Sequence, residues 1–209
     1  MRTVLYLHGF ASSPAGRKIA LLRKALPADH RVVAPDLNRP SFEKLDFDAI
    51  VTAALDAAEA DPPAVLVGSS LGALAALEAS RRGIDAPLVL VAPALAFGLR
   101  WIEKLAPGDP IPFFHHGENR EIPIHRRFFE QMAALSVERD APRPTVAVVM
   151  GVKDESVPFE GVYATWRRWE SSGGLAKGSR FVAIPDGDHG LVTHVDRIAE
   201  EVRTAAASG

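Results

Sequence analysis

The sequence predicts an α/β fold built on a mainly parallel sheet with helices on both faces. Short apolar runs rich in Val, Leu and Ile recur along the chain, and segments with helical periodicity lie between most of them. This alternation gives right-handed strand–helix–strand units, whose parallel strands are covered by helices on both sides. The chain has 209 residues, which fits one domain, so we expect a single domain over residues 1–209.

Each strand is predicted at a short apolar run bounded by turn residues. In chain order, the predicted strands are Val4–Leu7, Arg31–Ala34, Ala64–Val67, Leu88–Val91, Thr145–Met150 and Arg180–Ile184. The segments between them repeat apolar residues at helical spacing, and glycines follow several of them where a helix would end. The predicted helices are Pro14–Leu26, Phe42–Ala60, Leu71–Arg82, Phe159–Glu170 and Leu191–Ala206.

Residues 93–144 interrupt this alternation. The stretch contains several prolines, no convincing strand and many large aromatic side chains. It follows the carboxyl end of a predicted strand, where open α/β sheets bind ligands, so we expect a helical lid over the site. Trp101, Phe113 and Phe114 are candidate substrate contacts, although each aromatic side chain also fits a plain packing role.

Composition excludes several classes of function. The chain has 24 Lys and Arg against 26 Asp and Glu and no dense basic block, which gives no support for nucleic-acid binding and favours a small neutral partner. The absence of cysteine excludes disulfides, thiolate metal sites and cysteine nucleophiles. No apolar run suits a signal peptide or a membrane span, so we expect a cytoplasmic protein. The oligomeric state stays open.

The segment Gly68-Ser69-Ser70-Leu71-Gly72 lies between a predicted buried strand and an alanine-rich predicted helix. A Gly-x-Ser-x-Gly pattern in this context puts the serine on a sharp, strained turn above the carboxyl edge of the sheet. The flanking glycines allow strand and helix to approach closely. Ser70 is therefore the candidate nucleophile.

A serine nucleophile needs a base in contact with it, and the base needs a group that orients it. His189 follows the last predicted strand, and Asp154 follows the strand before it, so both loops emerge at the same edge as Ser70. Adjacent residues on a tight loop rarely reach the same ring nitrogen, so we prefer Asp154 as the acid over Asp186 and Asp188. Glu155 is the nearest substitute.

The negative oxygen of an acyl-transfer intermediate needs hydrogen-bond donors. The backbone N–H of Leu71, at the start of a helix, and that of Phe10, in the loop after the first strand, are the candidates. Gly9 allows that loop to come close and is a candidate substrate contact with Phe10. For His8, a local hydrogen bond that holds the loop is more probable than proton transfer, because only one base can face Ser70.

Histidine and carboxylate side chains gather in the predicted lid at His115, His116, Glu118 and His125. Their spacing matches no zinc-binding framework, so we favour a surface lid with titrating histidines. The chemistry above requires no metal and no cofactor.

The chain resembles the α/β-hydrolase superfamily and, within it, small bacterial esterases of the YqiA type. The resemblance rests on residues 5–14, 67–72, 92–94 and 187–190. It implies a serine hydrolase that acts on carboxylic esters, with a sheet that lacks the opening strands of larger hydrolases. A thioesterase, an amidase or an acyltransferase would use the same triad of Ser70, His189 and Asp154. A ligand-binding protein that converts no substrate is a further alternative.

Overall fold

A parallel sheet forms the centre of the molecule. The computed structural model describes residues 1–95, 105, 107–115, 119–135 and 139–207. Within these residues the main sheet has six strands in the order β2-β1-β3-β4-β7-β8, and every neighbouring pair is parallel. Its strands are β1 (Arg2–Leu7), β2 (His30–Val33), β3 (Val65–Ser69), β4 (Leu88–Val91), β7 (Val146–Gly151) and β8 (Arg180–Ile184). The predicted strands are thus confirmed to within a residue or two at their ends.

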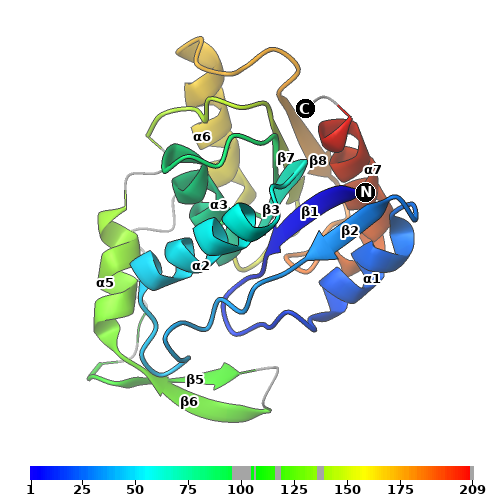
Figure 1. The fold of residues 1–209 in the computed structure, drawn as a ribbon. Coiled ribbons are helices and arrows are strands. Elements are labelled where there is room, and N and C mark those ends of the chain that lie inside the picture. Colours follow the sequence, from blue (N-terminus) through cyan, green and yellow to red (C-terminus); the bar gives the residue numbers. More distant parts are fainter. Residues whose placement is uncertain (96–104, 106, 116–118, 136–138, 208–209) are drawn as a thin grey trace.

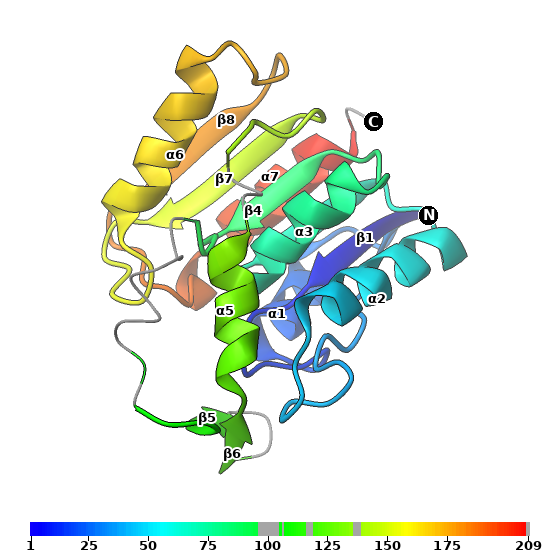
Figure 2. The ribbon, with the colours of Figure 1, turned by 90° about the vertical axis from the view of Figure 1, so that its left-hand side faces the viewer.

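Helices cover both faces of this sheet (Figures 1 and 2). One face carries α1 (Arg17–Ala25) and α7 (Val195–Ala206), with the short 3-10 helix η1 (Val192–His194) before α7. The other face carries α2 (Phe47–Ala60), α3 (Leu71–Arg81) and α6 (Phe159–Ser171). The predicted α/β class is confirmed. Across the described residues, no helix combines the length and the apolar character needed to cross a membrane.

Three predicted helices begin later than expected; in the last of them α7 begins at Val195 rather than Leu191, after the 3-10 helix η1. Helix α2 begins at Phe47 rather than Phe42, because the side chain of Asp46 accepts a hydrogen bond of 3.1 Å from the N–H of Ala49 and caps the first turn. Helix α1 begins at Arg17 rather than Pro14. The residues before Arg17 form a loop, and this loop lies beside the candidate site described below.

The insertion differs from the helical lid that the sequence predicted. It contains α5 (Arg126–Ala134), but also an antiparallel pair of strands, β5 (Ile111–His115) and β6 (Arg120–Ile124). The expectation of no strand in this stretch was wrong. Pro112 and Pro123 argue against a central strand, yet they lie opposite one another in this pair, where both strands are edges and proline is tolerated. Trp101 lies outside the described residues.

An aromatic cluster attaches the insertion to the loop after β1. The ring of Phe10 lies 5.4 Å from Phe42, 5.3 Å from Phe113, 6.2 Å from Phe128 and 6.0 Å from Phe129, measured between ring centroids. Aromatic pairs at such distances add stability beyond the area they bury. The β5–β6 pair, α5 and the loop that carries Phe10 therefore pack as one unit.

A polar contact fixes α5 to the start of α2. The side chain of Gln131 donates a hydrogen bond of 2.8 Å to Asp46 Oδ2 and accepts one of 3.3 Å from the N–H of Phe47. The hydrogen bonds from Gln131 and from the N–H of Ala49 hold the pKa of the Asp46 carboxyl below its usual value. Helix α5 is thus held in place beside the carboxyl edge of the sheet.

Candidate active site

Ser70 lies on a strained turn between β3 and α3. Its backbone has φ +53° and ψ −116°, a region that residues with a side chain rarely adopt. A Cβ atom added at Gly68 would lie 2.5 Å from the carbonyl oxygen of Gly72, and one added at Gly72 would lie 2.1 Å from that of Leu7. Both glycines are therefore required for the close contact of β1, β3 and α3 that presents the Ser70 hydroxyl at the sheet edge.

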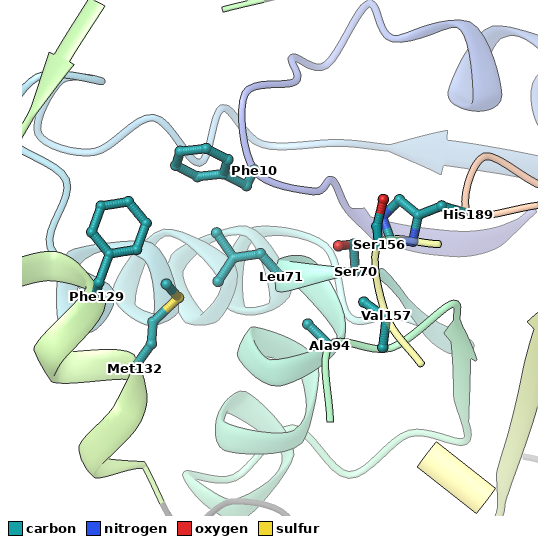
Figure 3. Close-up of a pocket in the computed structure, with 9 residues that line it drawn as sticks. All are labelled: Phe10, Ser70, Leu71, Ala94, Phe129, Met132, Ser156, Val157 and His189. Carbon is teal, nitrogen blue, oxygen red and sulfur yellow. The ribbon is translucent and has the colours of Figure 1, made fainter. Parts of the chain in front are cut away.

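The carboxylate of Asp154 holds the ring of His189. Asp154 follows β7 and His189 follows β8, and the His189 Nδ1–H donates a hydrogen bond of 2.8 Å to Asp154 Oδ2. The other carboxylate oxygen accepts hydrogen bonds from the backbone N–H groups of Ser156 (2.9 Å) and Val157 (2.8 Å). The Asp154 side chain is fully buried, so these three bonds fix its orientation. Nδ1 of His189 is thus occupied, and His189 lies next to Ser70 (Figure 3).

The other candidate acids have different partners. Asp188 Oδ1 accepts a hydrogen bond of 2.8 Å from the N–H of Leu191, which closes the turn after His189. Asp186 is exposed and lies 3.6 Å from His194 Nε2, and Glu155 is also exposed. Among the acids considered from the sequence, Asp154 is the one whose carboxylate contacts His189.

The loop after β1 lies directly against Ser70, and His8 shapes it. The Nε2 of His8 accepts a hydrogen bond of 3.1 Å from the N–H of Leu37, and its Nδ1–H donates one of 3.0 Å to the carbonyl of Gly9. The bond that Nε2 accepts requires a neutral ring, and burial lowers the pKa of His8 in agreement with this state. A Cβ atom at Gly9 would lie 3.3 Å from that of Ser70. This close approach brings the backbone of Phe10 to the site.

The start of α3 contributes a second backbone donor. The N–H of Leu71 belongs to the first turn of this helix, where N–H groups have no partner within the helix and the helix dipole favours negative charge. The N–H groups of Phe10 and Leu71 are thus available on the two loops that border Ser70.

An apolar cavity of about 180 Å³ opens beside Ser70 (Figure 3). Ser70 and His189 lie at one end of it, and α5 contributes side chains at the other. Sequence reasoning missed most of its wall, although the apolar spacing of α5 is a signal for an inward face. The lining residues are Phe10, Ser70, Leu71, Ala94, Phe129, Met132, Ser156, Val157 and His189.

Two of the predicted substrate contacts lie elsewhere. Phe113 does not line this cavity but packs behind its wall, with its ring 5.3 Å from Phe10 and 5.0 Å from Phe129. Phe114 is 46% exposed and is also absent from the lining. Consecutive residues of a strand point in opposite directions, and neither direction reaches this cavity.

A second, polar cavity of about 170 Å³ shares Ser70 and His189 with the first. Lys18, in the first turn of α1, lines it and donates a hydrogen bond of 2.9 Å to the hydroxyl of Ser69. Burial lowers the pKa of the Lys18 ammonium to about 8. The hydroxyl of Tyr6 lies beside Ser69, and its burial raises its pKa. The sequence analysis gave Lys18 no role.

Among the described residues, no group of three or more His, Cys, Asp or Glu side chains surrounds a possible metal position. His115 is buried, with its ring 4.4 Å from that of Phe42, whereas His125 lies 3.3 Å from Asp109 on the surface. Residues 116 and 118, which the sequence analysis considered with them, lie outside the described residues.

Comparison with solved structures shows what this architecture resembles. A structure of Est1E from Butyrivibrio proteoclasticus with ferulic acid bound matches with a TM-score of 0.75 at 21% identity, over 98% of this chain and 87% of that one. The esterase domain of a Rhodothermus marinus protein matches with a TM-score of 0.71 at 18% identity, over 98% and 88%. The monoacylglycerol lipase of Paleococcus ferrophilus matches with a TM-score of 0.72 at 16% identity, over 97% and 94%. A search of curated proteins gives no significant match.

These similarities define the fold: the chain has the α/β-hydrolase architecture, with the sheet and the strand-to-helix serine turn described above. The model of the uncharacterised protein family UPF0227 matches residues 3–172. The chain belongs to this family.

Proposed function

We propose that the protein is a carboxylic ester hydrolase that acts through an acyl-enzyme on Ser70. The observation that carries this proposal is the hydrogen bond of 2.8 Å between His189 and the buried Asp154, beside a serine on a strained strand-to-helix turn. A buried acid that orients an imidazole next to a serine is the arrangement that activates a hydroxyl for acyl transfer. The esterase and lipase structures matched above support the same reaction class for this fold.

The first half-reaction forms the acyl-enzyme. Nε2 of His189 takes the proton of the Ser70 hydroxyl while Oγ bonds to the ester carbonyl carbon, whose π electrons move to its oxygen. The N–H groups of Phe10 and Leu71 donate to this negative oxygen. The intermediate collapses, the bond to the alcohol oxygen breaks, and His189 gives its proton to the departing alcohol.

The second half-reaction repeats these steps with water. His189 takes a proton from the water as its oxygen attacks the acyl carbon, then returns a proton to Ser70 as the carboxylic acid leaves. Asp154 keeps its negative charge throughout, fixes the proton of His189 on Nδ1 and stabilises the imidazolium that forms transiently.

The apolar cavity supports a small-molecule ester with one modest apolar group. Its wall combines Phe10, Leu71, Phe129 and Met132, and its volume is about 180 Å³. Est1E, whose structure contains ferulic acid, provides an example of the same fold with a carboxylic acid bound. For this chain we expect short or medium acyl esters to be turned over faster than long ones, because the cavity is small.

Fluorophosphonate labelling followed by intact-mass measurement tests the proposal without a choice of substrate. The wild type is expected to gain one adduct, and Ser70→Ala to gain none. Ser156→Ala is the matched control, because Ser156 lines the same cavity but lies outside the strained strand-to-helix turn, and it is expected to keep the adduct. A folded wild type without an adduct, or an adduct that remains in Ser70→Ala, would contradict the proposal.

A further inference from the structure

The polar cavity shares Phe10, Ser70 and His189 with the apolar one but has a different character. Its walls come from the loop before α1, from the first turn of α1 and from the ends of β1 and β3. The volume of about 170 Å³ is several times the ~30 Å³ that a water molecule occupies in the liquid. Its polar side chains include Tyr6, Ser12, Arg17, Lys18 and Ser69.

Lys18 contributes a positive charge to the wall of this cavity. Within the described part of the chain, its ammonium has one hydrogen bond, to Ser69 Oγ at 2.9 Å, and no carboxylate lies within ion-pair distance. Asp154 and Asp188 act on it only through longer-range attraction. Asp154 is already bonded to His189 and two backbone N–H groups. Lys18 is only partly exposed, and charges held away from water are normally paired, so the open side of this ammonium favours an anion in the cavity.

We propose that this cavity binds an anionic group of the substrate, a carboxylate or a phosphate, with Lys18 as its ion-pair partner. The substrate of the site is then an ester that carries a negative charge a few atoms from the reacting carbonyl. This inference rests on the proposed function, because Ser70 and His189 line both cavities. The apolar part of such an ester lies against Phe129 and Met132, and the charged part lies against Lys18.

The position of Arg17 supports an anion rather than a neutral polar group. Arg17 lines the same cavity and is exposed, so it adds a second positive charge to the wall. Two positive charges around a small cavity attract anions and raise the local concentration of anions. The backbone N–H groups of Phe10 and Leu71, which are expected to stabilise the negative oxygen, also favour a negative charge near Ser70.

Lys18 could instead serve only to orient Ser69, the neighbour of the nucleophile. A role of that kind would affect neutral and anionic esters equally. The discriminating quantity is therefore a ratio measured on one enzyme: kcat/KM for an anionic ester divided by kcat/KM for a neutral ester of the same length.

Matched ester pairs measure this ratio. The 4-nitrophenyl hemiester of glutaric acid against 4-nitrophenyl valerate puts the charge on the acyl side. The butyrate ester of 3-hydroxypropanoate against propyl butyrate puts a carboxylate on the alcohol side, and the butyrate ester of ethylene glycol monophosphate puts a phosphate there. In the wild type we expect a ratio above one in at least one pair. In Lys18→Met we expect this ratio to fall about tenfold or more, the usual size of effect when a close charge pair is lost.

Two further variants act as controls. Lys18→Arg keeps the charge and is expected to retain part of the preference. Lys24→Met removes an exposed lysine of the same helix and is expected to keep the wild-type ratio. A wild type that prefers the neutral ester in every pair, or a ratio that Lys18→Met leaves unchanged, would overturn the inference.

A binding measurement separates this inference from the proposed function. Calorimetric titration of glutarate and of inorganic phosphate into the wild type and Lys18→Met needs no turnover. Binding to the wild type that is lost in Lys18→Met supports the anion site, even if fluorophosphonate labelling fails and the esterase proposal falls. Labelling that succeeds while neither anion binds and no anionic ester is preferred rejects the anion site alone.

Discussion

Replacing Lys18 by Met is expected to stabilise the folded protein at neutral pH. Folding buries this ammonium and lowers its pKa from the ordinary 10.5 to about 8. A lysine with a lowered pKa destabilises the folded state wherever the unfolded chain keeps its proton. Methionine has a similar length and no charge, so the substitution removes this cost while it keeps most of the packing.

The size of the effect follows from the pKa. A fall from 10.5 to about 8 corresponds to ~3 kcal/mol of lost stability at ~1.4 kcal/mol per pKa unit. The hydrogen bond to Ser69, which the variant also loses, stabilises by ~1 kcal/mol. The net gain at pH 7 is therefore ~2 kcal/mol, which raises Tm by ~4–8 °C for a chain of this size.

The pH dependence gives the sharper test. The cost of the charge is fully present below pH 8 and disappears as pH rises towards 10.5, because the unfolded chain binds the extra proton in that window. At pH 9.5 only ~1.4 kcal/mol of the cost is left, so the gain of Lys18→Met should fall close to zero. Tyr6, whose pKa burial raises, is present in both proteins and cancels in the difference.

Thermal and urea unfolding of the wild type, Lys18→Met and Lys24→Met at pH 7 and pH 9.5 provide the measurement. Lys24→Met should match the wild type at both values, since Lys24 is exposed. A Lys18→Met protein that is less stable than the wild type at pH 7 would refute the reasoning. So would a gain of the same size at both pH values.

Three further changes test the site and its supports. Gly72→Ala is expected to lower the free energy of unfolding by ~2 kcal/mol or more, because its Cβ would lie 2.1 Å from the Leu7 carbonyl oxygen; urea unfolding measures the loss, and an unchanged midpoint would show that this contact relaxes freely. Asp154→Asn should keep Tm close to the wild-type value but lower kcat by ~10²–10⁴-fold, since the amide no longer fixes the His189 proton on Nδ1. Full activity in this variant would show that Asp154 has no role in the mechanism. Gln131→Ala should lower the free energy of unfolding by ~1–2 kcal/mol, because two hydrogen bonds are lost. It should also raise KM for apolar esters more than it lowers kcat, because α5 forms one wall of the apolar cavity. A constant KM in steady-state kinetics would contradict this expectation.

The sequence was sufficient for the sheet, because buried parallel strands appear as uninterrupted apolar runs between helical segments. The strained turn at Ser70 and the approach of Asp154 to His189 could be anticipated for the same reason: all three follow strands whose carboxyl ends meet at one edge. The β5–β6 pair could not be anticipated from the sequence. Pro112 and Pro123 remove backbone donors, so each segment considered alone does not resemble a strand.

The polar cavity was also beyond sequence reasoning. Lys18 lies in a helix where a lysine is ordinarily a solvated surface residue. Its contact with Ser69 depends on how α1 packs against β1 and β3, which are separated from one another along the chain. Met132 and Val157 could not be predicted as lining residues of the apolar cavity for a similar reason, because segments distant in the sequence pack together there.

The two cavities around Ser70 share Phe10, Ser70 and His189, but different parts of the protein complete each one. Helix α5 of the insertion contributes Phe129 and Met132 to the apolar wall alone, whereas residues of α1, β1 and β3 contribute to the polar wall alone. Substitutions in the insertion can therefore alter the size of the apolar group without reaching the charged side. Laboratory evolution aimed at Phe129 and Met132 should therefore yield variants with new acyl preferences that keep the polar wall at Lys18.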